Sequence, residues 1–222
     1  SSPAYNYAGG QGGQIAAADF DHDGDIDVIA PNTGFNQSEP TNTVNLVTNN
    51  GAGVFTFAYE IACGQAPIAV AGTDVDDDRD VDLIVATTAW QSLNPAVSVL
   101  KNNGAGVFTD FMSVPLSGRP GRLTLGDIDR DGDEDVVVCV PATPTGGLIN
   151  IVAVLKVQQD GSLSPPQYYD AARPRFPVIQ DLNGDGWPEV VCASDGSGVR
   201  VLVNRGVGTF EHAHHNTIEE PK

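Results

Sequence analysis

Short runs of apolar and β-branched residues recur along the chain, and turns rich in glycine, asparagine and aspartate separate them. Four of these runs are TVNLVTN (43–49), AVSVLKN (96–102), INIVAVLKV (149–157) and VRVLVN (199–204). Runs of this length and composition, bounded by turn residues, are typical of β-strands, and no stretch has a sustained helical period. The pattern therefore predicts an all-β fold.

Two motifs repeat with the same period. An acidic segment occurs four times, as DFDHDGDID (19–27), DVDDDRDVD (74–82), DIDRDGDED (127–135) and DLNGDGWPE (181–189), and successive copies start 55, 53 and 54 residues apart. A glycine-containing turn keeps this spacing, as NNGAGVF (49–55), NNGAGVF (102–108), QQDGSL (158–163) and NRGVGTF (204–210). Two motifs that share one period indicate a tandem repeat of four units.

Each unit is predicted to contain four short antiparallel strands. The first strand precedes the acidic segment, the second follows it, the third ends at the glycine-containing turn, and the fourth begins after that turn. A four-stranded sheet of about 50 residues repeated at constant spacing is the signature of a β-propeller blade. We predict one β-propeller domain over 13–217, with terminal tails at 1–12 and 218–222 and blades at about 13–60, 66–115, 119–170 and 173–217.

Four blades are at the low end of the range for propellers. Each unit runs from its first to its fourth strand, and no strand is exchanged between the ends of the chain. This arrangement favours a closed four-bladed ring. The alternatives are a part of a larger propeller and a ring completed by another chain.

The acidic segment followed by an N-x-G-x-G-x-F turn resembles the FG-GAP or VCBS-type repeat of integrin-like β-propellers. The resemblance covers nearly the whole chain, because both motifs recur in tandem. It implies a calcium-bearing propeller of the kind found in adhesion proteins, fungal-type lectins and accessory regions of polysaccharide lyases. It is more specific for fold than for activity, because one fold carries many functions.

The acidic segments are predicted to bind metal ions. Positions 1, 3 and 5 carry side-chain oxygens and position 9 is a carboxylate, which is similar to the start of an EF-hand loop, where the carbonyl of position 7 also binds calcium. The predicted ligands are Asp19, Asp21, Asp23, Asp27 and the Asp25 carbonyl; Asp74, Asp76, Asp78, Asp82 and the Asp80 carbonyl; Asp127, Asp129, Asp131, Asp135 and the Asp133 carbonyl; and Asp181, Asn183, Asp185, Glu189 and the Trp187 carbonyl.

The second segment departs from this pattern, because Arg79 stands where the other three segments have glycine. Arginine reaches a positive φ only at a cost, and its charge lies close to the predicted ion. Oxygen ligands without His or Cys favour a hard cation, and an irregular loop suits calcium better than the strict octahedron of magnesium. We expect up to four calcium ions with a structural role.

The chain has 29 acidic and 11 basic residues and a formal net charge of −18, and twenty of the acidic residues lie in the four segments. This charge argues against nucleic acid and anionic membranes as partners. No apolar run approaches the roughly 18 residues of a membrane span, so membrane insertion is not expected. Because calcium is abundant outside cells, a secreted or cell-surface protein is predicted.

The opposite end of the blades is the predicted recognition surface, because its loops vary in length and composition. Arg119 and Arg122 precede the third blade, and Arg173 and Arg175 precede the fourth. They could bind an anionic glycan or protein, or they could pair with nearby carboxylates or line the centre of the ring. Trp90, Tyr168 and Tyr169 could stack on sugars or pack between blades.

Three functions fit these observations. The first is a noncatalytic, calcium-stabilised binding module for adhesion or carbohydrate recognition. The second is a propeller-type polysaccharide lyase or a portion of one, and the third is a structural or assembly subunit. No nucleophile elbow, phosphate-binding loop or zinc motif is present, which favours binding over catalysis. A homo-oligomer and a multidomain parent protein are both compatible with the sequence, and Cys63, Cys139 and Cys192 are expected to be buried thiols.

Overall fold

The computed structural model describes residues 13–32, 41–88, 94–143, 147–194 and 198–212. Within these ranges the chain forms sixteen strands and no helix, so they hold no helix long and apolar enough to cross a bilayer. The strands form four sheets of four consecutive strands each, with antiparallel neighbours throughout. The predicted all-β fold of four-stranded blades is confirmed.

Each sheet follows chain order from its first to its fourth strand. The first sheet contains β1 (Ala16–Ala18), β2 (Asp27–Pro31), β3 (Thr43–Asn49) and β4 (Phe55–Ala62). The second contains β5 (Pro67–Thr73), β6 (Asp82–Thr87), β7 (Ala96–Asn102) and β8 (Phe108–Pro115). The third contains β9 (Leu123–Gly126), β10 (Asp135–Ala142), β11 (Leu148–Leu155) and β12 (Gln167–Asp170), and the fourth contains β13 (Pro174–Gln180), β14 (Glu189–Ser194), β15 (Gly198–Asn204) and β16 (Phe210–His212).

The hydrophobic core lies between the sheets and forms three layers. Strand β6 contributes to two of them: Leu83 and Val85 pack toward the first sheet, and Ile84 and Ala86 pack toward the third. All four side chains are fully buried. Successive side chains of a strand point to opposite faces, so a strand buried on both faces needs an unbroken apolar run. The apolar run after each acidic segment meets this requirement.

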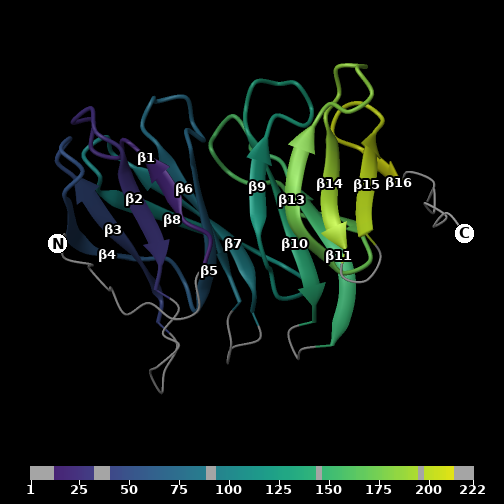
Figure 1. Ribbon diagram of the computed structural model, residues 1–222, viewed down its shortest axis with the longest axis horizontal. Helices are drawn as coiled ribbons and strands as arrows, with labels where there is room; N and C mark the ends of the chain where they lie inside the picture. The colour runs from purple at the N-terminus through teal and green to yellow at the C-terminus, as the bar shows by residue number, and fades with distance from the viewer. Residues whose placement is uncertain (1–12, 33–40, 89–93, 144–146, 195–197, 213–222) are drawn as a thin grey trace, which may run out of the picture.

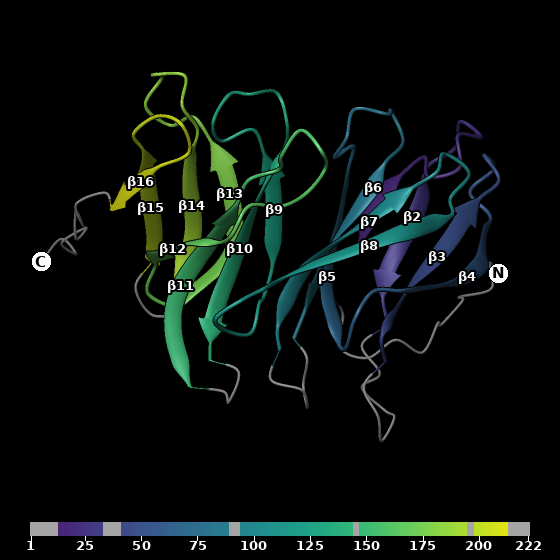
Figure 2. The same cartoon turned by 180° about the vertical axis from the view of Figure 1, so that it is seen from behind.

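The sheets form an open arc rather than a closed ring. The first strands of neighbouring sheets contact each other, from β1 to β5, from β5 to β9 and from β9 to β13. In both views the first and fourth sheets lie at opposite ends of the row (Figures 1 and 2). The favoured four-bladed closed ring is therefore wrong, and the arrangement matches the predicted alternative, part of a larger propeller. Chain order within each unit could not reveal this, because it does not set the angle between blades.

The four acidic segments lie at one end of the sheets, at the top of Figure 1, together with the glycine-containing turns. The two motifs touch within each of the first two blades. A Cβ atom at Gly51 would lie 2.6 Å from the Asp25 carboxylate, and one at Gly104 would lie 2.7 Å from that of Asp80. Both glycines also have a positive φ, so the turn needs glycine for space as well as for conformation.

Gln14, which precedes β1, joins three blades near the centre of the arc. Its backbone pairs with Ala69 of β5, and its side chain accepts from the N–H of Leu123 at 3.1 Å and donates to the Leu123 carbonyl at 2.9 Å. The three cysteines are buried and free, as expected. Cys139 and Cys192 face each other between the third and fourth sheets, with their sulfur atoms 4.0 Å apart.

Candidate metal centre

The four acidic loops share one backbone conformation. The residue at position 6 has a positive φ in every loop: Gly24 (91°), Arg79 (74°), Gly132 (104°) and Gly186 (89°). Its N–H donates to the carboxylate of position 1, over distances of 3.0, 2.7, 3.2 and 2.9 Å in chain order. The predicted cost at Arg79 is therefore present, because this arginine holds the conformation that glycine adopts freely.

Position 4 also has a positive φ in every loop, although only one of its residues is glycine. The four residues are His22 (59°), Asp77 (60°), Arg130 (64°) and Gly184 (77°). Sequence reasoning missed this position, although His and Asp are among the residue types enriched at positive φ; Arg130 carries no such signal. Two of these side chains reach position 7 of the following blade: His22 lies 3.5 Å from Asp80, and Arg130 lies over the Trp187 ring at 5.2 Å.

Three of the four loops bring carboxylates together. In each trio, one oxygen from each residue lies within 4.8 Å of the other two: Asp19, Asp21 and Asp27; Asp74, Asp76 and Asp78; Asp127, Asp129 and Asp135. Calcium–oxygen distances are about 2.3–2.6 Å, so the ligands of one ion lie within about 5 Å of one another. Asp23, Asp82 and Asp131 belong to no trio, and the carbonyls of position 7 remain predicted ligands.

Each trio also contains a buried oxygen that lacks a hydrogen-bond partner. These atoms are Oδ1 of Asp19, Oδ1 of Asp76 and Oδ1 of Asp129. A buried carboxylate oxygen without a partner loses its hydration and receives nothing in return, which costs several kcal/mol for a charged group. A cation bound in the trio would supply the missing partner. The donor set and these three oxygens therefore fit a divalent metal ion.

The carboxylate at position 9 has a second role that the sequence pattern did not reveal. Asp82 is fully buried and accepts from the N–H of Val75 at 3.0 Å and from the N–H of Asn102 at 2.7 Å. Asp27 and Asp135 make the same pair of bonds in their own blades. The position-9 carboxylate therefore links the acidic loop to the end of the third strand by hydrogen bonds, with or without a bound metal ion.

Burial raises the pKa of these position-9 carboxyls. The pKa of Asp82 rises to about 6 and that of Asp135 to about 7, because burial disfavours the charged form and neighbouring carboxylates repel it. The pKa of Asp27 is raised for the same reasons. Backbone N–H groups that donate to these carboxylates act in the opposite direction. A bound cation would stabilise the charged form.

Lysine side chains enter the second and third loops. Lys101 lies 3.0 Å from Asp76, and Lys156 lies 2.8 Å from Asp129. Both ammonium groups also donate to a carbonyl of the next blade, from Asp160 and Val207 respectively. The equivalent residue of the first blade is Thr48, which carries no charge. Of the three loops with a carboxylate trio, the first is therefore the one in which no lysine competes with a bound cation. The sequence pattern did not predict this ranking of the sites.

The fourth loop keeps the turn and lacks the trio. The Asn183 amide nitrogen donates to Asp185 at 3.0 Å and to Glu189 at 3.2 Å. These two bonds use carboxylate oxygens that a cation would need. No carboxylate trio involves this loop among the described residues. Its prediction as a fourth site stays untested.

Of the predicted anion-binding residues, Arg119, Arg122 and Arg173 lie in the connectors before the third and fourth blades, and Arg175 lies on β13. Arg122 lies over the Phe176 ring at 5.8 Å, and Arg119 pairs through its N–H with the Ala142 carbonyl at 2.7 Å. Arg173 and Arg175 are exposed at the start of β13. The Tyr168 hydroxyl accepts from the Ser117 N–H and the Tyr169 ring packs edge-on against Phe210, whereas Trp90 lies outside the described residues.

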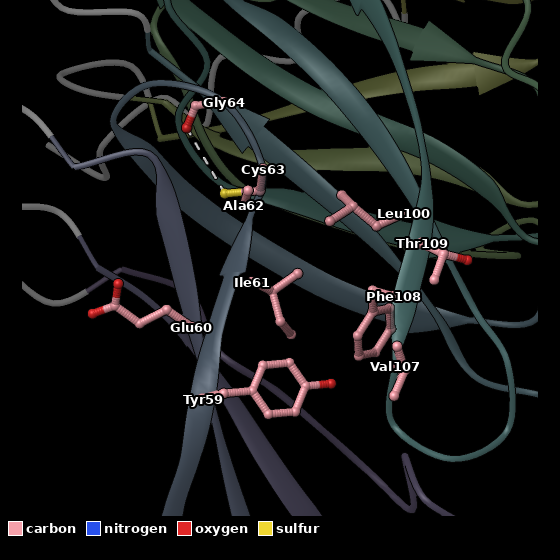
Figure 3. A pocket seen from close by; sticks show the side chains of 10 residues that line it. All are labelled: Tyr59, Glu60, Ile61, Ala62, Cys63, Gly64, Leu100, Val107, Phe108 and Thr109. Atoms are coloured by element: carbon pink, nitrogen blue, oxygen red, sulfur yellow. Dashed lines mark hydrogen bonds between the residues drawn. The ribbon is translucent and has the colours of Figure 1, made fainter.

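A separate pocket of about 440 Å³ lies between the outer strands β4 and β8. Tyr59, Ile61, Leu100 and Phe108 line it, and the Glu60 carboxylate points away from them (Figure 3). The Tyr59 hydroxyl donates to the Gly106 carbonyl, which links the two blades at this point. The pocket is mainly apolar, and Cys63 also lines it. Burial raises the pKa of the Cys63 thiol to about 12, which disfavours the nucleophilic thiolate.

Comparison with known proteins supports the fold. The FG-GAP-like repeat family matches residues 74–138 and 181–221. BBS1N, from a crystal structure of its complex with ARL6DN, superposes with a TM-score of 0.58 at 10% identity, over 92% of this chain and 58% of BBS1N. A chain of the Photorhabdus luminescens Tc holotoxin pore gives a TM-score of 0.48 at 15% identity, over 95% of this chain and 10% of that one.

No curated protein matches the chain. The present chain spans little more than half the length of BBS1N, and the likeness to it shows the fold alone. The repeated motifs, the four sheets and the family match, which covers 106 of the 222 residues, support an FG-GAP-like β-propeller. The sheets do not close into a ring, which is consistent with part of a larger propeller.

Proposed function

We propose that this chain is a noncatalytic binding module in which calcium ions stabilise the blades. The observation that carries the proposal is the unpartnered buried oxygen in each of three carboxylate trios. An ion there would link side chains at positions 1 and 3 of one loop. It would thereby fix the connection between the first and second strands of the blade.

Calcium is the proposed ion because the ligands are oxygens on an irregular loop. Magnesium demands near-octahedral geometry at shorter distances and gives up its water reluctantly. The first loop is the proposed strongest site, with Asp19, Asp21 and Asp27 as side-chain ligands. The second and third loops follow, because Lys101 and Lys156 must be displaced or must share a carboxylate with the ion.

The proposed setting is the secreted or cell-surface compartment. Extracellular modules bind calcium at about 0.1–1 mM, a concentration that is reached outside cells and not in the cytosol. The proposed partner is a protein or a glycan bound at the surface of a rigid scaffold. BBS1N, which shares the fold, was solved with a protein partner, and this favours a protein.

Calorimetric titration and thermal melting test the metal. The chain is titrated with calcium after chelation, beside the variants Asp21→Asn and, as a control outside the loops, the exposed Asp170→Asn. In Asp21→Asn, the side-chain amide oxygen still accepts from the Asp23 N–H, whereas the negative charge of the carboxylate is lost. We expect calcium to raise the melting temperature, and Asp21→Asn to weaken the tightest site at least about tenfold, or about 1.4 kcal/mol. Identical melting in calcium and in chelator would overturn the proposal.

A further inference from the structure

The interface between the third and fourth blades contains two cysteines that face each other. Cys139 lies on β10 and Cys192 lies on β14, and their sulfur atoms are 4.0 Å apart. Each of the two residues is 1% exposed. The third and fourth sheets lie side by side in both views (Figures 1 and 2), and the two cysteines belong to the core layer between them. The pair is therefore part of a packed interior contact between two blades.

The repeat does not require cysteine at either of these positions. Cys139 lies four residues after the position-9 carboxylate of the third blade, and Cys192 lies three residues after that of the fourth blade. Between the second and third blades, the same two positions hold Ala86 and Val138, which are fully buried in one core layer. Alanine and valine thus fill the contact that cysteines make between the third and fourth blades. Packing alone therefore does not account for the meeting of two cysteines.

The two sulfur atoms need only a short movement to form a bond. The S–S distance in a disulfide is about 2.05 Å, so the separation of 4.0 Å must shorten by about 2 Å. Strand β13 contacts β10 and pairs with β14, and its register with β14 shifts between Arg175 and Pro177, beside Cys192. Rotation of the two side chains and a small shift at this irregularity can supply the movement. Disulfides that join two packed sheets also occur in immunoglobulin domains.

The two thiols differ in their readiness to react. The hydrogen bond with Cys139 lowers the pKa of the Cys192 thiol, although burial acts in the opposite direction. The pKa of the Cys139 thiol is raised, first by the same hydrogen bond and then by burial, and the charge of Arg175 opposes this rise. The thiolate is the form of cysteine that attacks a disulfide. Cys192 is therefore the sulfur that attacks first, and Cys139 is the second.

We propose that Cys139 and Cys192 form a disulfide bond between the third and fourth blades, with a small-molecule disulfide, oxidised glutathione, as the oxidant. The Cys192 thiolate attacks one sulfur of the oxidant, which breaks its S–S bond and releases one glutathione. The Cys139 thiolate then attacks the Cys192 sulfur of the mixed disulfide and releases the second glutathione. Two cysteine thiols are oxidised, the oxidant is reduced to two thiols, and the two cysteine protons pass to the released glutathione.

The bond would prevent the two blades from separating. In a repeat protein each unit contacts only its neighbours, so one blade can open while the others stay folded. The two cysteines are 53 residues apart along the chain, so the bond closes a long loop and restricts the unfolded chain. Because both residues are 1% exposed, the folded interface also shields the bond from reductants in solution. The fourth blade would then stay attached to the third blade when it opens locally.

Oxidation followed by counting of thiols tests the pair. The reduced chain is treated with oxidised glutathione in calcium, both when folded and during refolding from urea, because buried thiols react slowly. After quenching with acid, the chain is unfolded and labelled with a maleimide at neutral pH. The chain has three cysteines, so the count of free thiols should fall from three to one. The mass should be that of one copy less two hydrogen atoms, and peptide mapping should find Cys139 joined to Cys192.

Three other results of this experiment would overturn the proposal. The first is a count of three free thiols after both treatments. The second is a product that carries glutathione adducts and no internal bond. The third is a bond that includes Cys63, which lies on the first blade side of the molecule and belongs to another core layer.

A double variant and a matched control test the effect of the bond on stability. Cys139→Ala with Cys192→Val places at this interface the two residue types that the second and third blades use, so the variant should fold without a bond. In the parent chain the bond should raise the melting temperature by about 5 °C or more over the reduced form. The double variant should melt at one temperature under both conditions.

Cys63→Ala is the matched control, because it removes the remaining buried thiol and leaves the pair intact. This variant should keep the shift of the parent chain between oxidised and reduced forms. A shift that persists in the double variant, or one that is lost in Cys63→Ala, would overturn the assignment of the bond. Equal melting of the oxidised and reduced parent chain would overturn its stabilising role.

Discussion

The second and fourth acidic loops depart from the repeat in opposite ways, and the difference separates two roles of the loop. The second loop has lost its turn glycine, yet Arg79 keeps the positive φ and the bond to Asp74, and three carboxylates still gather. The fourth loop keeps Gly186 and the bond to Asp181, but the Asn183 amide uses the carboxylate oxygens. The conformation of the turn therefore depends on positions 1 and 6, and its capacity for a cation depends on position 3.

Removing the position-9 carboxylate should have the largest effect on the free energy of unfolding, and the loss should be greater in the second loop than in the fourth. Asp82→Ala leaves the buried N–H groups of Val75 and Asn102 without an acceptor, so the free energy of unfolding should fall by about 3 kcal/mol. Glu189→Ala frees the N–H of Leu182, which lies in an exposed residue, so its loss should be about 1 kcal/mol. Urea unfolding in chelator measures both, and equal losses would contradict the comparison.

A change of pH should act on the loops with buried position-9 carboxyls. The folded-state pKa values of Asp82 and Asp135, about 6 and about 7, lie above the ordinary value of 3.8, so folding favours their protonated forms. Stability should therefore be lost as pH rises through this range. Without calcium, the free energy of unfolding should be about 1.5 kcal/mol lower at pH 8 than at pH 6.

Calcium should reverse this trend, because it binds the ionised carboxylates. Urea titrations at the two pH values, with calcium and with chelator, measure the difference. Greater stability at pH 8 than at pH 6 in chelator would show that these carboxyls are not destabilised by burial.

Substituting the residue at position 6 of the loop should have the smallest effect on stability. Arg79→Gly removes a strained side chain at φ 74°, and the greater flexibility of glycine in the unfolded chain offsets part of the gain, so stability should rise by about 0.5 kcal/mol. Gly186→Ala introduces the same strain at φ 89° and should lower stability by about 1 kcal/mol. Thermal melting in chelator compares the pair, and a loss of stability in Arg79→Gly would mean that the arginine makes a contact worth more than its strain.

The fold was largely predictable from the sequence, because strand order within a blade is a local property. A constant period, apolar runs and turn residues suffice to place four sheets. The angle between blades is not local: it depends on how side chains such as Leu83 and Ile84 fill the layers on either side of β6. For this reason the sequence could not show that the arc is open.

The candidate site was predictable in part. The spacing of aspartates indicated which loops gather oxygens. The lysines that enter these loops, Lys101 on β7 and Lys156 directly after β11, lie more than twenty residues further along the chain. The positive φ at Arg130 carried no signal, because arginine is not typical of that conformation, whereas His22 belongs to a residue type that is enriched there. The exposure of Leu182 depends on what packs against the fourth blade, which the loop itself does not encode.

Gln14 imposes an order on the assembly of the domain during synthesis. Its side chain bonds to Leu123, which is 109 residues further along the chain. A nascent first blade therefore lacks this bond until the start of the third blade has left the ribosome. Contacts between such distant residues slow folding, because a long loop must close before they form. The first of these four blades can thus be translated before the third and still be among the last of the four to reach its final position.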